Sequence, residues 1–207
     1  MDDKKTIGAL LLLAAASAGV FWLVRRGRKE DDSVPTLINP NNNSNTNNTM
    51  ATLSFPDLDM RGYGKLLSRG YRNNNPVNIE YNAGNSWLGQ TGISPEGRFA
   101  QFESLPYGYR AALALLRGKG YIQKGINTIR KMIEKFAPKT ENYTETYIRF
   151  VSNKSGIGEN VVISKNDKDS LCRIVWAMAQ FENENTPTTQ QLGLPDMNII
   201  YKGWELL

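Results

Sequence analysis

An uncharged apolar run near the start of the chain, residues 7–24, limits where a water-soluble core can form. A helix of that length measures roughly 27 Å, close to the hydrocarbon thickness of a bilayer. Lys4 and Lys5 precede the run, and four basic residues follow it at positions 25–29. We therefore predict an uncleaved transmembrane anchor over residues 1–29, which contacts the lipid bilayer through residues 7–24.

A cleaved signal peptide is the alternative for this segment. Ala16, Ser17 and Ala18 are small residues of the kind that signal peptidase accepts after a short apolar core. The apolar run continues for six more residues before the basic cluster ends it, which favours the anchor. The basic cluster after the span favours a cytoplasmic location for that side of the membrane.

The next segment, residues 30–60, is polar and low in complexity, and asparagine dominates its centre at positions 41–48. Such a composition cannot bury enough apolar surface to fold. We interpret it as a disordered, flexible linker that tethers the remaining residues, 61–207, to the anchor.

The globular domain predicted for residues 61–207 is basic, with 19 Lys and Arg against 13 Asp and Glu. This charge suits an anionic polymer, but no nucleic-acid motif accompanies it. The whole chain has no histidine and one cysteine, which excludes catalysis that needs imidazole and any disulfide within the chain. If the domain is an enzyme, its acid and base groups are therefore carboxylates, and we expect neither a metal ion nor a cofactor.

Helical spacing of apolar residues predicts a mainly α domain. The pattern indicates helices from Ser104 to about Tyr121, over 126–136, from Asn142 through Val151, and over 167–183. Glycines among short apolar stretches between 73 and 102 indicate loops and a small hairpin.

Glu182 is the sharpest chemical clue. It lies eleven residues after Leu171 on the last of these helices, so it falls on the same apolar face, whereas Glu184 points away. A dry environment and the negative end of the helix dipole both raise the pKa of a carboxyl there. A carboxylic acid that stays protonated near neutral pH can protonate the leaving oxygen of a glycoside. The alternative is a glutamate whose side chain reaches solvent from a frayed helix end.

The run from Arg72 to Ile79 is dense in side-chain amides. Asparagine and proline are typical of tight turns with local hydrogen bonds, and the same amides could also form a binding surface.

Several motifs of this domain recur together in a known group of proteins. In chain order they are Arg72-Asn73-Asn74-Asn75-Pro76-x-Asn78-Ile79, Trp87-x-Gly89, Phe99-x-x-Phe102, Gly108-x-Arg110-Ala111, Asn127-Thr128-Ile129, Phe136-Ala137-Pro138, Glu141-Asn142-x-Thr144-x-x-Tyr147 and Glu182-Asn183. Over residues 69–187 the chain resembles the phage and prophage virion-associated lysozyme-like peptidoglycan hydrolases, including lytic transglycosylase-like members. The resemblance implies a lysozyme-like fold that acts on peptidoglycan glycan strands. A broader resemblance to lysozyme-like transglycosylases and glucosaminidases implies a circularly permuted arrangement, because here the asparagine-rich loop comes first and the helix that carries the glutamate comes last.

The resemblance and the residue chemistry together assign roles. Glu182 is the expected general acid and base, and Glu141 is the second catalytic candidate. Asp167 and Asp169 lie roughly 20 Å along the helix from Glu182, too far for paired glycosidase carboxylates, which favours a mechanism with one carboxylate. The expected substrate-binding residues offer amides, aromatic faces and one guanidinium: Arg72, Asn74, Asn75, Asn78, Trp87, Asn142 and Tyr147.

The anchor and the resemblance predict a protein of the virion membrane, held in the host inner membrane before assembly, with capsid proteins as further partners. Val77 and Glu184 occupy positions that are usually glycine in the resembled proteins. These departures keep open a noncatalytic virion membrane or capsid protein that binds peptidoglycan. A nucleic-acid-binding module is a weaker alternative, because only charge supports it.

Overall fold

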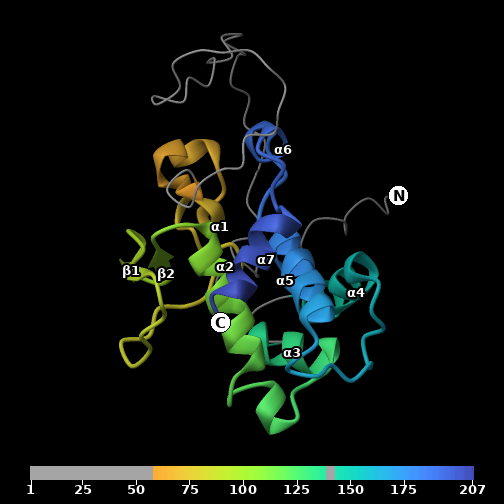
Figure 1. Cartoon of the computed structure of the whole chain (residues 1–207). Coiled ribbons are helices and arrows are strands. Elements are labelled where there is room, and N and C mark those ends of the chain that lie inside the picture. Colours follow the sequence, from red (N-terminus) through yellow and green to blue (C-terminus); the bar gives the residue numbers. More distant parts are fainter. Residues whose placement is uncertain (1–57, 139–142) are drawn as a thin grey trace, which may run out of the picture.

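The computed structural model describes residues 58–138 and 143–207, and Figure 1 shows their arrangement. The helices and strands, in chain order, are the 3-10 helix η2 (Met60–Leu66), α1 (Arg69–Arg72), β1 (Gln90–Ile93), β2 (Ala100–Phe102), α2 (Leu105–Arg117), the 3-10 helix η3 (Ile122–Lys124), α3 (Ile129–Phe136), α4 (Thr144–Ser155), α5 (Lys168–Glu182), α6 (Pro187–Gln191) and α7 (Met197–Glu205). The prediction of a mainly α domain is confirmed, while a permuted lysozyme-like fold stays a prediction.

The predicted anchor, residues 1–29, and nearly all of the predicted linker lie outside the described residues. Within 58–138 and 143–207, no helix has the length and apolar character needed to cross a membrane. Two apolar residues just before the predicted start of the domain at residue 61 are part of the described fold. Leu58 and Met60 are 1% and 3% exposed and pack in the core, so the folded part includes at least these residues.

Helix α5 forms the centre of the helical core. It packs against α4 on one side and against α2 and α7 on the other (Figure 1). Its predicted inner face is confirmed, because Leu171, Ile174, Val175 and Met178 are all at most 1% exposed. Asp167 caps the helix by accepting a hydrogen bond from the backbone N–H of Ser170 at 3.1 Å.

Helices α2 and α7 cross in close contact. A Cβ at Gly203 of α7 would lie only 2.9 Å from the carbonyl oxygen of Pro106 and from the backbone nitrogen of Arg110 on α2. Glycine at this position therefore allows the two backbones to approach. This crossing holds the C-terminal helix against the core.

The predicted hairpin is present. Strands β1 and β2 pair antiparallel, with Gln90 opposite Phe102 and Ile93 opposite Ala100. A bridge between Glu80 and Phe99 continues the pairing beyond the strands. This segment lies beside α1 and α2 in Figure 1, and it forms one side of the candidate site.

Candidate functional site

A cavity of about 400 Å³ lies between the loop after α1 and the end of α3. Polar groups and aromatic rings share its wall. The lining includes Asn78, Glu80, Trp87, Arg98, Tyr121, Lys135 and Glu182. We call this cavity the glutamate cavity. Its wall contains both the loop after α1 and the last residue of α5, which were predicted to lie close together.

Glu182 is buried at the C-terminal end of α5, with 3% of its surface exposed. Its Oε2 accepts a hydrogen bond of 3.0 Å from the Asn78 side-chain amide. Its Oε1 has no hydrogen-bond partner among the described residues. Burial raises the pKa of the Glu182 carboxyl above its ordinary value, and Asn78, Tyr147 and Arg69 act against that rise. The predicted position on the apolar face is confirmed.

Asn78 adopts a left-handed backbone conformation, with φ of 52°. Asparagine tolerates this conformation better than most residues, so the loop can turn its amide toward α5. The side chain is 7% exposed, and besides Oε2 it also reaches the Glu182 carbonyl oxygen at 3.4 Å. Asn78 therefore both touches the candidate acid and borders the cavity.

Tyr147 lies next to Glu182, but its predicted contact with a sugar ring does not fit its position. The residue is fully buried, and its ring stacks on Phe181 with 3.8 Å between ring centroids. Its hydroxyl interacts with the Glu182 carboxyl without meeting the geometry of a hydrogen bond. Since its ring is buried, Tyr147 does not border the cavity and contacts the Glu182 carboxyl from the core.

Asn74 and Asn75 also do not fit their predicted role in substrate binding. Both are fully buried. The Asn74 amide donates to Asp59 Oδ1 and to the carbonyl oxygens of Phe102 and Glu103, and its oxygen accepts from the Met60 N–H. These hydrogen bonds occupy the amide, so Asn74 fixes the loop from beneath.

Asn75 has the same structural character. Its amide donates to the carbonyl oxygens of Ile79 and Ala100 at 2.9 and 2.8 Å, and its oxygen accepts from the Ile79 N–H at 2.9 Å. With no free donor or acceptor and no exposed surface, it ties the loop to the hairpin rather than to a ligand.

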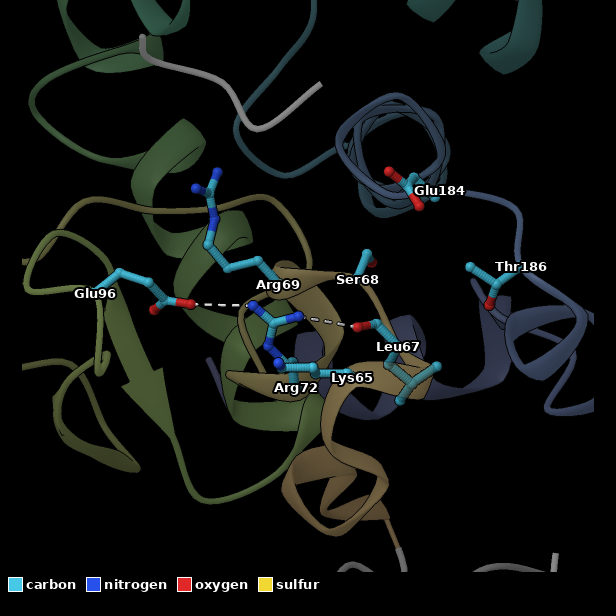
Figure 2. A pocket seen from close by; sticks show the side chains of 8 residues that line it. All are labelled: Lys65, Leu67, Ser68, Arg69, Arg72, Glu96, Glu184 and Thr186. Carbon is cyan, nitrogen blue, oxygen red and sulfur yellow. Dashed lines mark hydrogen bonds and ion pairs between the residues drawn. The ribbon is translucent and has the colours of Figure 1, made fainter. Parts of the chain in front are cut away.

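Arg72 lies apart from Glu182. Its guanidinium pairs with Glu96 at 3.1 Å and donates to the Leu67 carbonyl oxygen at 3.2 Å, in a second pocket (Figure 2). Arg72 does not border the glutamate cavity, and its role in substrate binding stays a prediction. Its helix α1 has only one turn, and the side chain leaves that turn on the side of Glu96.

Arg69 is the cation whose charge acts on the candidate acid, and it was not among the predicted site residues. Its Nε donates to Asn78 Oδ1 at 3.4 Å, and its guanidinium lies 4.0 Å from the centroid of the Phe99 ring. It is among the groups that act against the rise in the pKa of Glu182. The sequence signal that could have identified Arg69 was its position about one helical turn before Arg72.

Trp87 borders the glutamate cavity and is partly buried. Its indole Nε1 is buried without a hydrogen-bond partner in the described part of the chain. The role of Trp87 in substrate binding stays a prediction. The indole N–H without a partner is a further reason to expect it. Glu141 and Asn142, the other predicted site residues, lie outside the described residues.

Asn183 locks the loop onto the end of α5. Its amide donates to the carbonyl oxygens of Pro76 and Ala179 at 2.7 and 2.8 Å, and its oxygen accepts from the Ser68 hydroxyl at 2.7 Å. A Cβ on Gly70 would collide with this side chain. The Glu182-Asn183 pair thus joins one cavity-facing acid to one structural amide.

The structure accommodates Val77 and Glu184, the two residues at positions that are usually glycine in the resembled proteins. Val77 is 1% exposed in the core, and its φ is not positive, because the described non-glycine residues with positive φ are Asn74 and Asn78. Its backbone conformation therefore does not demand glycine. Glu184 is exposed and borders the second pocket.

Together, the fold and this site define a mainly helical domain in which a buried carboxyl at a helix end opens to a polar, aromatic-lined cavity. No family model matches the chain. The chain is similar to protein P5 of Pseudoalteromonas phage PM2, with 36% identity over 124 residues, which cover 59% of this chain and 75% of P5. The chain therefore belongs to the family of this phage protein.

Proposed function

We propose that this chain is a membrane-anchored phage virion protein that cleaves peptidoglycan glycan strands and so assists genome entry through the cell wall. The observation that carries the proposal is Glu182, a buried carboxyl with a raised pKa and one oxygen without a partner, at the wall of a polar cavity. Such a group is suited to general acid catalysis of glycoside cleavage.

In the proposed reaction, Glu182 gives its proton to the oxygen of the glycosidic bond as the bond from that oxygen to the anomeric carbon breaks. The C6 hydroxyl of the same sugar then attacks the anomeric carbon, and its proton returns to the Glu182 carboxylate. The product is a 1,6-anhydro sugar, as in a lytic transglycosylase. In this mechanism a single carboxylate serves first as acid and then as base.

A second carboxylate borders the cavity, and its environment favours a different role. Glu80 pairs with Arg98 at 2.6 Å, and its side chain is 64% exposed. Water solvates the Glu80 carboxylate, and the Arg98 guanidinium forms an ion pair with it. For this reason we favour the mechanism in which the sugar's own hydroxyl completes the reaction over a two-carboxylate hydrolase.

Substrate binding in this proposal falls to Asn78 and Trp87. Asn78 can hold Glu182 and meet a sugar hydroxyl or acetamido group at the cavity wall. Trp87 can offer its indole N–H to the same ligand. Neutral donors and an aromatic ring match the surface of an N-acetylated sugar.

The location in the virion membrane is supported by two separate facts. The chain belongs to a family with a phage protein, and residues 7–24 form an uncharged apolar run of spanning length. Capsid proteins as partners follow from the same placement.

The test is to incubate the purified full chain, held in detergent, with purified peptidoglycan and to analyse soluble products by mass spectrometry. We expect muropeptides that end in 1,6-anhydro sugars. Products with reducing ends would instead indicate a hydrolase. Sedimentation of the protein with peptidoglycan, without any soluble product, would favour the noncatalytic wall-binding alternative.

A further inference from the structure

A second pocket, of about 330 Å³, lies between the first helices and the segment that follows α5. Figure 2 shows Glu96 on one side of its arginines and Glu184 and Thr186 on the other. Its lining includes the cations Lys65, Arg69 and Arg72, the carboxylates Glu96 and Glu184, and the hydroxyl residues Ser68 and Thr186. We call it the basic pocket, since three of its side chains are cations.

Two of those cations form no direct ion pair, although the negative charges of Glu96 and Glu182 act on Arg69. Arg72 is paired with Glu96 at 3.1 Å, but neither Lys65 nor Arg69 forms an ion pair with any described residue. The Nη2 of Arg69 is buried and has no hydrogen-bond partner in the same part of the chain. A buried guanidinium nitrogen without an acceptor is unfavourable, so an anionic oxygen is the complementary ligand.

The basic pocket adjoins the glutamate cavity through Arg69. Its Nε donates to Asn78 Oδ1, and the amide of that asparagine donates to Glu182. The backbone of Asn183, between the two pockets, is extended. Of its two neighbours, Glu182 borders the glutamate cavity and Glu184 borders the basic pocket. The basic pocket is therefore linked to the candidate acid by a chain of two hydrogen bonds, from Arg69 to Asn78 and from Asn78 to Glu182.

We propose that the basic pocket binds a carboxylate of the substrate while a neutral N-acetylated sugar occupies the glutamate cavity. This inference rests on the proposed cleavage of peptidoglycan. The carboxylate has two possible sources in that polymer, the lactyl group of a muramic acid residue without its peptide and the acidic residues of an attached stem peptide. Both offer the same oxygen acceptors to Lys65 and Arg69.

The test measures the dissociation constants of three ligands by calorimetry, using the full chain with Glu182→Gln to prevent turnover. The ligands are an N-acetylglucosamine tetramer without carboxylate, a peptide-free peptidoglycan tetrasaccharide, and the same tetrasaccharide with stem peptides. To this background we add Lys65→Met, Glu184→Gln or Lys119→Met in turn. Lys119 is an exposed lysine after α2 and serves as the matched control.

We expect Lys65→Met to weaken binding of a carboxylate-bearing ligand by roughly two- to five-fold, the usual range for one partly exposed charge. Glu184→Gln should strengthen the same binding, because it removes a negative charge from the pocket. Neither substitution should change binding of the N-acetylglucosamine tetramer, and Lys119→Met should change nothing. An effect on the peptide-free ligand assigns the lactyl carboxylate, and an effect on the peptide-bearing ligand alone assigns the stem peptide.

The inference is overturned if Lys65→Met leaves all three dissociation constants unchanged or weakens the uncharged tetramer equally. In both cases, measurable binding of the N-acetylglucosamine tetramer would still support the proposal that the glutamate cavity binds glycan. Absence of binding by every ligand, together with absence of cleavage by the wild type, would instead overturn the proposed function.

Discussion

Asn78 and Glu182 are 104 residues apart in the sequence, and their side chains meet through a hydrogen bond of 3.0 Å. The contact joins a left-handed turn after α1 to the last residue of α5. It leaves the second carboxyl oxygen, Oε1, without a partner in the described structure. The donor thus orients the carboxyl, whose other oxygen is the one that the proposed reaction uses.

Asn78→Gly tests this orientation. Glycine keeps the left-handed backbone and removes only the amide. The Asn78 hydrogen bond acts to lower the pKa of Glu182, so its loss should raise that pKa further. We expect the alkaline limb of the pH–activity profile to move to higher pH, with a lower maximal rate from the lost orientation. An unchanged alkaline limb would contradict this role of Asn78.

Glu182→Gln should make the protein more stable at neutral pH. Below its ordinary pKa of 4.5, the carboxyl is protonated in both the folded and the unfolded state. As pH rises above that value, the unfolded state loses the proton first, so the wild type loses stability until the raised pKa of the folded state is passed. Glutamine cannot ionise, and its oxygen can still accept from Asn78.

The measurement is the thermal midpoint at pH 4 and at pH 7. The gain of Glu182→Gln over wild type should be larger at pH 7, with each 1 kcal/mol corresponding to about 2–4 °C. Glu205→Gln, an exposed glutamate at the end of α7, is the matched control and should show no such trend. A gain that is equal at both pH values would contradict the raised pKa.

Asn75→Ala should destabilise the fold rather than weaken a ligand. It removes three hydrogen bonds and leaves the Ile79 N–H and two carbonyl groups buried without this partner. We expect a loss of about 2–4 kcal/mol in the free energy of unfolding, measured by urea denaturation. Asn153→Ala, at an exposed position of α4, should cost less than about 1 kcal/mol. An equally small loss of unfolding free energy in both variants would contradict the structural role of Asn75.

Trp87→Phe separates the indole N–H from the ring. Phenylalanine keeps an aromatic face in the cavity but cannot donate to a ligand. We expect glycan affinity to fall by roughly three- to ten-fold, the range of one lost hydrogen bond, with little change in the thermal midpoint. Trp204→Phe on α7, which does not border the cavity, should leave affinity unchanged. Full affinity in Trp87→Phe would show that the buried N–H meets no substrate.

The sequence predicts Glu182 well because helix periodicity alone places it on the buried face of α5. It predicts less about the asparagines. An Asn amide can serve a ligand or the backbone equally, and the choice for Asn75 depends on a carbonyl at Ala100, 25 residues further along the chain. Local pattern carries no information on that partner.

The choice between two arginines shows the same limit. Arg69 and Arg72 share one short helix, and the ring of Phe99, distant in sequence, holds the Arg69 guanidinium near Asn78. Helix α7 was not predicted, and its close packing against α2 depends on Gly203. Tertiary contacts decide these features.

The most direct test of the account is the initial rate at which the full chain releases soluble muropeptides from peptidoglycan. Wild type, Glu182→Gln and the matched control Glu205→Gln are compared at equal concentration, after thermal melting confirms that each is folded. We predict that Glu182→Gln lowers the rate at least about 100-fold, the usual contribution of a general acid, and that Glu205→Gln retains the wild-type rate. Wild-type activity in Glu182→Gln would contradict the central claim.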